Sequence, residues 1–291
     1  MSNQKSLLGI FLSLGVAFCV MVALSHGSTK VEGVPVIAIC CAIAFGVQWL
    51  MFMPAYLLKT EHFYDATGAL THITIVLVAI VSIPTVSLRD ILIALLVFVW
   101  ASRLGSFLFL RVRDAGGDVR FKKIKHNFLM FLMTWTLQGL WVFLTLAMAL
   151  AAITSNLKKD LDAFAWVGLS VWLFGFVFEV MADHQKSKFR RDSKNKGAFI
   201  RGGLWSWSRH PNYFGEIVLW VGIAILAAPV LEGWQWVGLI SPVFVAFLLL
   251  RVSGVGLLEA QGTERWGHDP GYQNYIARTS ILIPFPPASE S

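Results

Sequence analysis

Charged residues are scarce in this chain: Asp, Glu, Lys and Arg together make up 14% of its 291 residues, against 56% hydrophobic residues. In a soluble domain about a quarter of the residues are charged. Cysteine is also rare, because Cys19, Cys40 and Cys41 are the only three, and all lie in apolar runs with no CxxC pair. These shortages exclude an ordinary soluble domain and a disulfide framework, and they indicate a membrane protein.

Several catalytic signatures are missing as well. The chain has neither GxGxxG nor GxxxxGK[ST], which argues against Rossmann and P-loop nucleotide binding. Its seven histidines are scattered, without HExxH or HxxHH, and there is no GxSxG elbow. We therefore expect no metal site and no acyl-enzyme mechanism.

Long apolar runs are what the chain has in abundance. A membrane-crossing helix needs about 20 mostly apolar residues. The candidate spans are 7–25, 34–58, 70–87, 90–110, 128–153, 162–182, 213–230 and 236–256. We predict an all-α integral membrane protein, a bundle of about eight transmembrane helices that forms a single membrane domain over 1–291.

The basic residues indicate the topology of these spans. Lys and Arg concentrate in cytoplasmic loops. With both termini inside, the inner segments carry 20 of the 24 Lys and Arg residues, and the outer ones only Lys30, Arg89, Lys158 and Lys159. The net charge of +7 then gathers on one membrane face, where it could meet membrane lipids or an anionic ligand, so nucleic acid is not an expected partner. The first 25 residues also imitate a secretory signal.

Polar side chains gather in three cytoplasmic stretches, 100–127, 179–216 and 257–287. Glu179 and Asp183 are one helical turn apart and share a face. Polar groups at membrane depth are costly and tend to be functional.

The seventh span begins with unusually dense hydrogen-bonding capacity. If its helix starts near Pro211, then Asn212, Glu216 and Trp220 share one face. Free N–H groups and the positive end of the dipole, with Arg209 and His210 just before them, would form an anion site that suits a phosphate. Basic residues at span ends are commonly topology markers, but topology does not require Asp183, Asn212 or Glu216.

Three stretches carry a resemblance to a known family. They are "ADHQKSKFRR" (182–191), "GLWSWSRHPNYFGEIVLW" (203–220) and "YQNYIARTSILIPF" (272–285). Over roughly 55–287 the chain resembles the steroid 5α-reductase family, most closely a bacterial branch of unknown function with a GLWxxSRHPNYFGE motif. The resemblance implies a seven-helix bundle that binds NADPH at its cytoplasmic side and reduces the C=C bond of an enone in a steroid-like or other lipid substrate.

The resemblance also implies how the chain is organised. Residues 7–33 would be an extra N-terminal span, 34–256 the reductase-like core, and 257–291 a cytoplasmic C-terminal segment that completes the cofactor site. The expected location is a bacterial inner membrane with both termini cytoplasmic, and no oligomeric state is implied.

Carried over by position, the family pattern implies two groups of site residues. The expected cofactor contacts, with their neighbours in the same stretches, are Asp183, Arg190, Arg209, His210, Asn212, Tyr213, Glu216, Trp220, Arg251, Tyr272 and Tyr275. The expected catalytic residues are Tyr64, Asp65 and Arg103, which would stabilise the negative charge that hydride transfer builds on the enone oxygen.

Two departures from the family pattern are visible. Trp100 stands where a substrate-binding tyrosine is expected, and Glu259 replaces another tyrosine after the last span. The stretch "FYDATG" around Tyr64 and Asp65 is also compatible with a tight turn.

Two other functions remain open at this point. Isoprenylcysteine and phospholipid methyltransferases, which bind S-adenosylmethionine, carry a similar RHP-x-Y-x-G run, and Glu259 and Glu264 fit them better. The "NYFGE" form with Asp183 and Arg190 favours the reductase. A non-enzymatic lipid-binding protein would have little use for a buried polar face.

The charge distribution yields a first testable prediction. A reporter that is active only in the cytoplasm should be active when it is fused after Ser291, because twenty basic residues are assigned to that side. The matched control is a fusion beside Lys159, where only a reporter that works outside should be active. The opposite pattern at the two positions would contradict the topology.

Overall fold

The computed structural model describes residues 3–114, 116–118, 121–252 and 254–286. Within these ranges eight helices are long and apolar enough to cross a membrane, as expected from the sequence, so the chain is an all-α integral membrane protein. The chain divides into two compact units. Unit 1 comprises 1–165 and 226–241, and unit 2 comprises 166–225 and 242–291.

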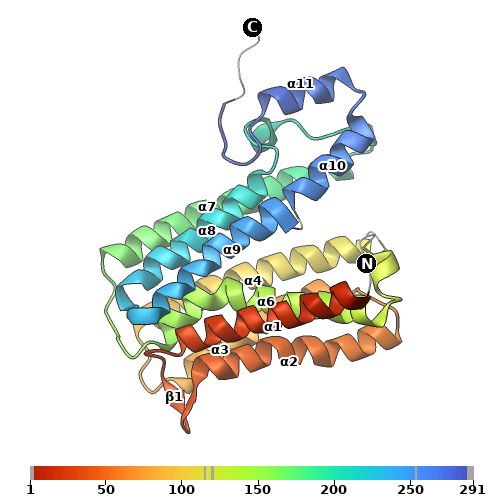
Figure 1. Ribbon diagram of the computed structural model, residues 1–291. Helices are drawn as coiled ribbons and strands as arrows, with labels where there is room; N and C mark the ends of the chain where they lie inside the picture. The colour runs from red at the N-terminus through yellow and green to blue at the C-terminus, as the bar shows by residue number, and fades with distance from the viewer. Residues whose placement is uncertain (1–2, 115, 119–120, 253, 287–291) are drawn as a thin grey trace. The chain divides into compact units, whose positions relative to one another are not determined.

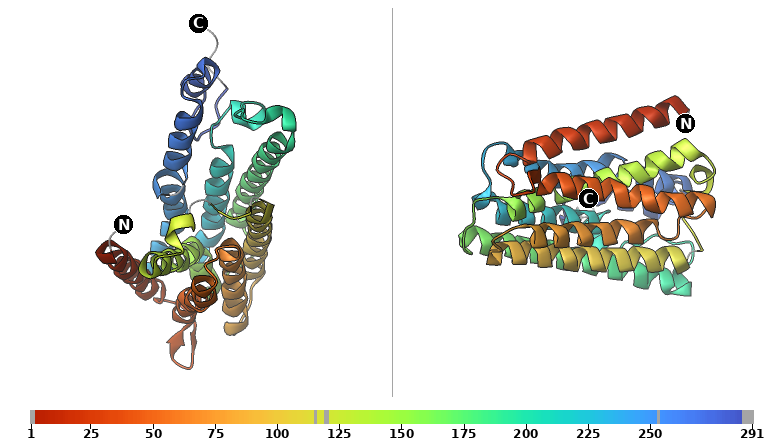
Figure 2. Two further views of the ribbon diagram at one scale, coloured as in Figure 1. Left: turned by 90° about the vertical axis from the view of Figure 1, so that its right-hand side faces the viewer. Right: turned by 90° about the horizontal axis from the view of Figure 1, so that it is seen from below.

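Unit 1 is built around one buried helix. It contains the helices α1 (Asn3–Leu24), α2 (Val36–Leu57), α3 (Tyr64–Ser82), α4 (Leu88–Asp114), α5 (Phe121–Ile124) and α6 (Phe128–Thr154), which are labelled in Figure 1 apart from the short α5. A short hairpin precedes α2 and consists of two antiparallel strands of two residues each, β1 (Lys30–Val31) and β2 (Val34–Pro35). Most of the apolar part of α6 is buried, because α1, α2, α3 and α4 all pack against it. Figure 2 draws these helices from two further sides.

The third helix is not where its hydrophobicity alone placed it. We expected a span over 70–87, but α3 begins at Tyr64 and ends at Ser82, before Pro84. The hydroxyls of Thr67 and Thr71 donate to carbonyl groups one turn earlier, so polar residues at its start are accommodated within the helix. Tyr64 and Asp65 therefore open a helix, and the alternative of a tight turn for these two residues is wrong.

Arg89, at the start of α4, is completely buried. Its guanidinium donates to the carbonyl oxygens of Leu226 (2.6 Å) and Asp160 (2.7 Å) and lies 2.9 Å from the carboxylate of Asp162. A buried charge is tolerated only when it is paired and hydrogen-bonded. Arg89 therefore ties α4 to two segments that are distant in the sequence, so its part in the fold exceeds that of a topology marker.

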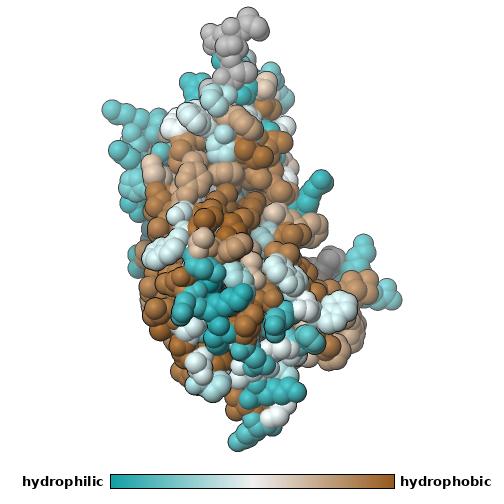
Figure 3. All heavy atoms as spheres, turned by 90° about the vertical axis from the view of Figure 1, so that its left-hand side faces the viewer, coloured by the Kyte–Doolittle hydropathy of each residue, from teal (hydrophilic) through white to brown (hydrophobic). Residues whose placement is uncertain are grey.

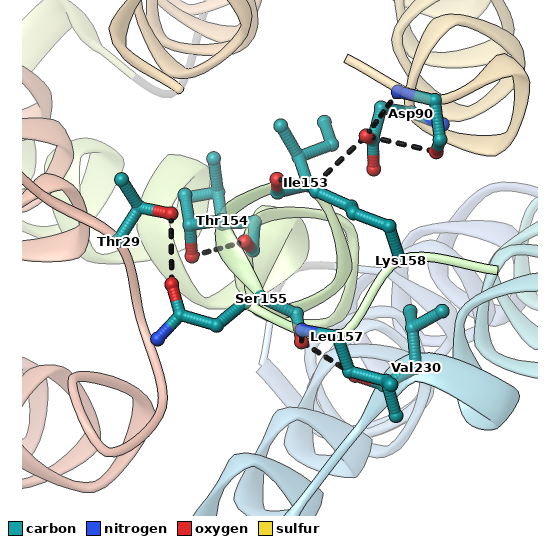
Figure 4. A network of polar contacts seen from close by, with 11 residues as sticks. Thr29, Asp90, Ile153, Thr154, Ser155, Leu157, Lys158 and Val230 are labelled. Carbon is teal, nitrogen blue, oxygen red and sulfur yellow. Dashed lines mark hydrogen bonds and ion pairs between the residues drawn. The ribbon is translucent and has the colours of Figure 1, made fainter. Parts of the chain in front are cut away.

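A second polar network lies beside the end of α6 (Figure 4). The Lys158 ammonium donates to the carbonyl oxygen of Ile153 (2.7 Å) and lies 2.9 Å from the buried carboxylate of Asp90. The Ser155 hydroxyl donates to the carbonyl oxygen of Val230 (2.7 Å). The bond to Ile153 satisfies one of the carbonyl groups that the end of α6 leaves open, and the other two contacts tie this end to α4 and to Val230.

Unit 2 contains the remaining long helices. They are α7 (Ala163–Arg191, in this unit from Trp166), α8 (Pro211–Ala227, up to Ile225), α9 (Ile240–Phe247, from Pro242), a π-helical turn (Leu248–Val252), α10 (Val255–Trp266) and α11 (Pro270–Arg278). The helix α7 continues nine residues beyond the predicted span 162–182, and α8 begins at Pro211 as expected.

Large hydrophobic side chains are exposed on both units. They include Leu50, Val81, Phe174 and Val243. The face drawn in Figure 3 is largely covered by hydrophobic side chains, with hydrophilic ones gathered in patches. A soluble monomer rarely exposes apolar surface of this extent. In a membrane protein such a surface faces the lipid.

The buried arginine yields the second prediction. Arg89→Met should lower the free energy of unfolding of the detergent-solubilised protein by about 2–4 kcal/mol, because two carbonyl groups and Asp162 lose their charged donor. Lys159→Met, which changes an exposed basic residue nearby, should stay within about 0.5 kcal/mol of the wild type. Thermal unfolding measures both, and equal effects would contradict the role given to Arg89.

Candidate functional site

The predicted site residues fall in both units. Tyr64, Asp65 and Arg103 belong to unit 1, and the predicted cofactor contacts belong to unit 2.

Glycines bring the backbones of α7 and α8 together in unit 2. A Cβ atom on Gly175 would lie 2.5 Å from the backbone nitrogen of Leu219, and one on Gly215 would lie 2.6 Å from that of Glu179. Gly222 makes the same kind of approach to Trp172. No larger residue fits at these positions without separating the helices. The glycine of the "NYFGE" motif is therefore a packing residue.

This contact places the polar residues of the two helices side by side. Asp183 on α7 is buried, and its carboxylate accepts a hydrogen bond of 3.1 Å from the side-chain amide of Asn212 on α8. Glu179, one turn before Asp183, is buried too. Glu216 follows Asn212 by one turn and is half-buried, and Trp220, a further turn on, is buried. The structure thus joins Asp183 and Asn212, which the sequence analysis had linked only by resemblance.

Arg209 and His210 do not face open solvent. Both bind the carboxylate of Glu259 on α10: the Arg209 guanidinium pairs with one oxygen, and His210 Nε2 lies 2.8 Å from the other. The ring of Tyr213 stacks on His210 with 5.5 Å between centroids and 8° between planes. Our expectation of a phosphate site at Arg209 and His210 thus omitted their pairing with Glu259, which we had noted as a departure from the family pattern and as closer to the methyltransferases.

The start of α8 offers fewer free donors than expected. The N–H groups of Tyr213 and Phe214 donate to the carbonyl oxygen of His210, and Pro211 has none. Of the first residues of α8, Asn212 keeps a backbone N–H for which the described chain shows no acceptor. His210 adds a second open group, because its Nδ1 is buried with no hydrogen-bonding partner among the described residues.

The C-terminal segment packs onto this end of unit 2. The backbone N–H of Arg209 donates to the carbonyl oxygen of Ser280 (2.8 Å), and the Tyr275 hydroxyl donates to the carbonyl oxygen of Trp205 (2.8 Å). Tyr272 and Tyr275 pack around the ring of Phe199. Burial raises the pKa of both tyrosines above the ordinary value, so their hydroxyls stay protonated at neutral pH.

The other basic residues of unit 2 are more exposed. Arg190, near the end of α7, and Arg251, in the π-helical turn, are both exposed. The Lys186 ammonium lies 4.4 Å from the ring centroid of Trp205, a cation–π contact. This end of unit 2 therefore combines positive charge with aromatic surface.

Asp65 lines a small cavity in unit 1. The cavity measures about 20 Å³ and lies between α3, α4 and α6. Its walls are Asp65, Ala69, His72, Trp100, Ala101, Leu104, Gly105, Leu108 and Trp141. Trp100, which stands where the family pattern has a tyrosine, is thus brought to the same cavity as Asp65. His72, which the sequence analysis counted among scattered histidines, was missed.

Tyr64 and Arg103 are not part of this lining. The Tyr64 hydroxyl donates to the carbonyl oxygen of Thr134 (3.0 Å), and its ring packs against Phe121 and Trp135. Arg103 is half-buried on α4 and lies over the ring of Phe107, 5.2 Å from its centroid. The structure therefore places the neighbours Tyr64 and Asp65 in different surroundings.

Comparison with known proteins gives one match over most of the chain. A family model described as "Protein of unknown function (DUF1295)" matches residues 51–279. This range includes every predicted site residue, from Tyr64 to Tyr275.

Curated relatives match over shorter stretches. The chain is 30% identical over 118 residues to the 3-oxo-5-alpha-steroid 4-dehydrogenase 1 of Rattus norvegicus, which is 40% of this chain and 40% of that protein. It is 23% identical over 137 residues to the steroid 5-alpha-reductase DET2 of Arabidopsis thaliana, 45% of this chain and 47% of that one. The matches thus cover less than half the length of these relatives. No solved structure gives a significant match.

The loop before α3 yields a prediction on pH. Glu61 is buried, which alone would raise its pKa, but Lys125 (2.8 Å) and the N–H of Asp118 (3.0 Å) lower the pKa below its ordinary value of 4.5. Its stabilising effect is therefore full above about pH 4.5 and is lost as the pH falls through the lower pKa of the folded protein.

Glu61→Gln should lower the melting temperature at pH 7, and this difference should shrink as the pH falls below 4.5. Glu32→Gln, an exposed change in the β1–β2 turn, should leave the whole profile unaltered. A difference that stays constant from pH 7 to pH 3 would rule out the ionised pair.

Proposed function

The chain belongs to the DUF1295 family, and from this premise we propose that it is a membrane reductase that uses NADPH to reduce the C=C bond of an enone in a steroid-like or other lipid substrate. The named relatives act, by their descriptions, on 3-oxo-5α-steroids or as a steroid 5α-reductase. One observation supports the proposal above all. It is the hydrogen bond between the buried Asp183 and the half-buried Asn212, beside a basic and aromatic end of unit 2, within the range that the family covers.

The residues of unit 2 fit such a cofactor chemically. A dinucleotide needs cations for its phosphates, acceptors and donors for its ribose and carboxamide groups, and flat surfaces for its rings. Arg190 and Arg209 supply the charge, and Tyr272 and Tyr275 supply aromatic surface. The buried His210 Nδ1, which no described residue bonds, supplies an open polar atom inside the same cluster.

Each group of residues has its role in this proposal. When bound, NADPH supplies a hydride. Asn212 and Glu216 orient the nicotinamide end, with Asp183 fixing the Asn212 amide, and Trp220 and Arg251 complete the cofactor contacts. Arg209 exchanges part of its bond to Glu259 for a phosphate, while Tyr213 keeps the His210 ring in place by stacking.

Unit 1 provides the polarising groups in this proposal. Reduction of an enone builds negative charge on the carbonyl oxygen, which a donor in a dry site stabilises. A protonated Asp65 and the Arg103 guanidinium are the donors we assign. Because the Tyr64 hydroxyl already donates to Thr134, we give Tyr64 the role of supporting the start of α3.

The proposal predicts a specific loss in two variants. NADPH should raise the melting temperature of the wild type, since a ligand at 100 times its Kd stabilises the folded state by about 2.7 kcal/mol. In Asn212→Ala and Glu216→Gln the shift should fall to less than a third, while the unliganded proteins remain folded. Glu32→Gln is the control and should retain the full shift.

The same assay can overturn the proposal. S-adenosylmethionine in place of NADPH tests the methyltransferase alternative. If only S-adenosylmethionine raises the melting temperature, the methyltransferase function replaces the reductase. If both variants keep the NADPH shift, the motif at the start of α8 is a structural cap.

A further inference from the structure

His72, which lines the small cavity between α3, α4 and α6, has a polar atom that the proposed reaction does not use. His72 on α3 is fully buried. Its Nδ1 lies 2.8 Å from the carbonyl oxygen of Gly68, which can only accept, so Nδ1 carries the ring proton. In the neutral ring Nε2 is then a lone-pair acceptor, and no described group bonds to it. A buried acceptor without a donor is uncommon in folded proteins and calls for a cause.

Aromatic rings hold this imidazole in one orientation. The rings of Trp100 and Trp141 meet it edge to face, with centroids 5.1 Å and 4.7 Å away and interplanar angles of 77° and 71°. Such contacts fix the ring plane. The direction of the lone pair is therefore set by packing.

Small residues leave space at this level of the bundle. Gly105 on α4 and Ala69 on α3 line the cavity, and they pack so closely that a Cβ atom on Gly105 would clash with Ala69, so the free space lies beside this contact. The cavity of about 20 Å³ has room for about one hydroxyl or water. A larger ligand would therefore place only one such group in it.

Asp65, Ala69 and His72 form one stripe along α3. They are spaced by four and three residues and all line the cavity. Seven residues of helix rise about 10 Å, so the Cα atoms of Asp65 and His72 lie about that far apart along the helix axis. A ligand that met both would carry polar groups at its two ends and an apolar body between them.

We propose that this cavity binds the hydroxyl group of a lipid or steroid-like ligand, which donates a hydrogen bond to His72 Nε2. The inference rests on the proposed function in one respect, because it takes Asp65 as the group that meets the enone end. His72 is then a specificity-determining residue that does not touch the reacting atoms. A site with a buried acceptor discriminates against an analogue that lacks the donor, since that analogue leaves the acceptor unpaired.

The test compares two ligands in the absence of NADPH, so its outcome does not depend on reduction. The probes are testosterone and androst-4-en-3-one, which differ only in the 17-hydroxyl group. Binding to the detergent-solubilised protein is followed by quenching of tryptophan fluorescence, to which Trp100 and Trp141 contribute. We expect the wild type to bind testosterone about tenfold more tightly than the deoxy compound, which corresponds to about 1.4 kcal/mol.

The variants assign this preference to one atom. His72→Leu should bind both steroids equally, whereas His72→Gln, which keeps an acceptor, should retain part of the preference. Thr74→Val, an exposed change on the same helix, should behave as the wild type. If His72→Leu does not fold, the contrast between His72→Gln and Thr74→Val still decides.

Three results would overturn the inference. They are equal binding of the two steroids by the wild type, which would mean that a bound water donates to His72 Nε2; no binding of either steroid; or a preference that survives in His72→Leu.

The two proposals can fail separately. A hydroxyl preference without NADPH oxidation would refute the reductase and leave the His72 site intact. Reduction of both steroids with equal affinity would do the reverse.

Discussion

The close contact between α7 and α8 is the constraint on which the candidate cofactor site depends. Gly175, Gly215 and Gly222 let the two backbones touch, and a methyl group at any of them would push the helices apart. Helices in lipid gain no hydrophobic driving force from meeting each other, so such close packing provides much of their association. It also places the Asn212 amide against the Asp183 carboxylate, a bond that tolerates little displacement.

The polar groups inside this apolar chain are of two kinds. Arg89, Lys158 and Glu61 are bonded to carbonyl groups or opposite charges, and their purpose is to tie loops and helix ends together. His72 and His210 each keep a buried ring nitrogen that no described residue bonds. An unpaired buried polar atom costs about 1–3 kcal/mol, and it is to these two ring nitrogens that our proposals assign a ligand.

Much of the fold could be predicted from hydrophobicity and charge, since eight apolar runs correspond to the eight candidate spans. The predicted bounds were wrong where polar side chains are accommodated within a helix. The start of α3 was missed because Thr67 and Thr71 satisfy their hydroxyls on the helix itself, which no hydropathy pattern records. The helix α7 continues beyond the predicted span 162–182, since a polar, basic extension carries no apolar signal.

The sequence by itself determined the class of protein, the start of α8 at Pro211 and the shared face of Glu179 and Asp183, because these follow from composition and helical periodicity within one segment. Only the tertiary structure decided which residues meet. Glu259 binds His210 across 49 residues of chain, and Trp141 reaches His72 from another helix. Such pairings depend on how helices pack, and packing is set by the shapes of many side chains at once, which no single stretch of sequence contains.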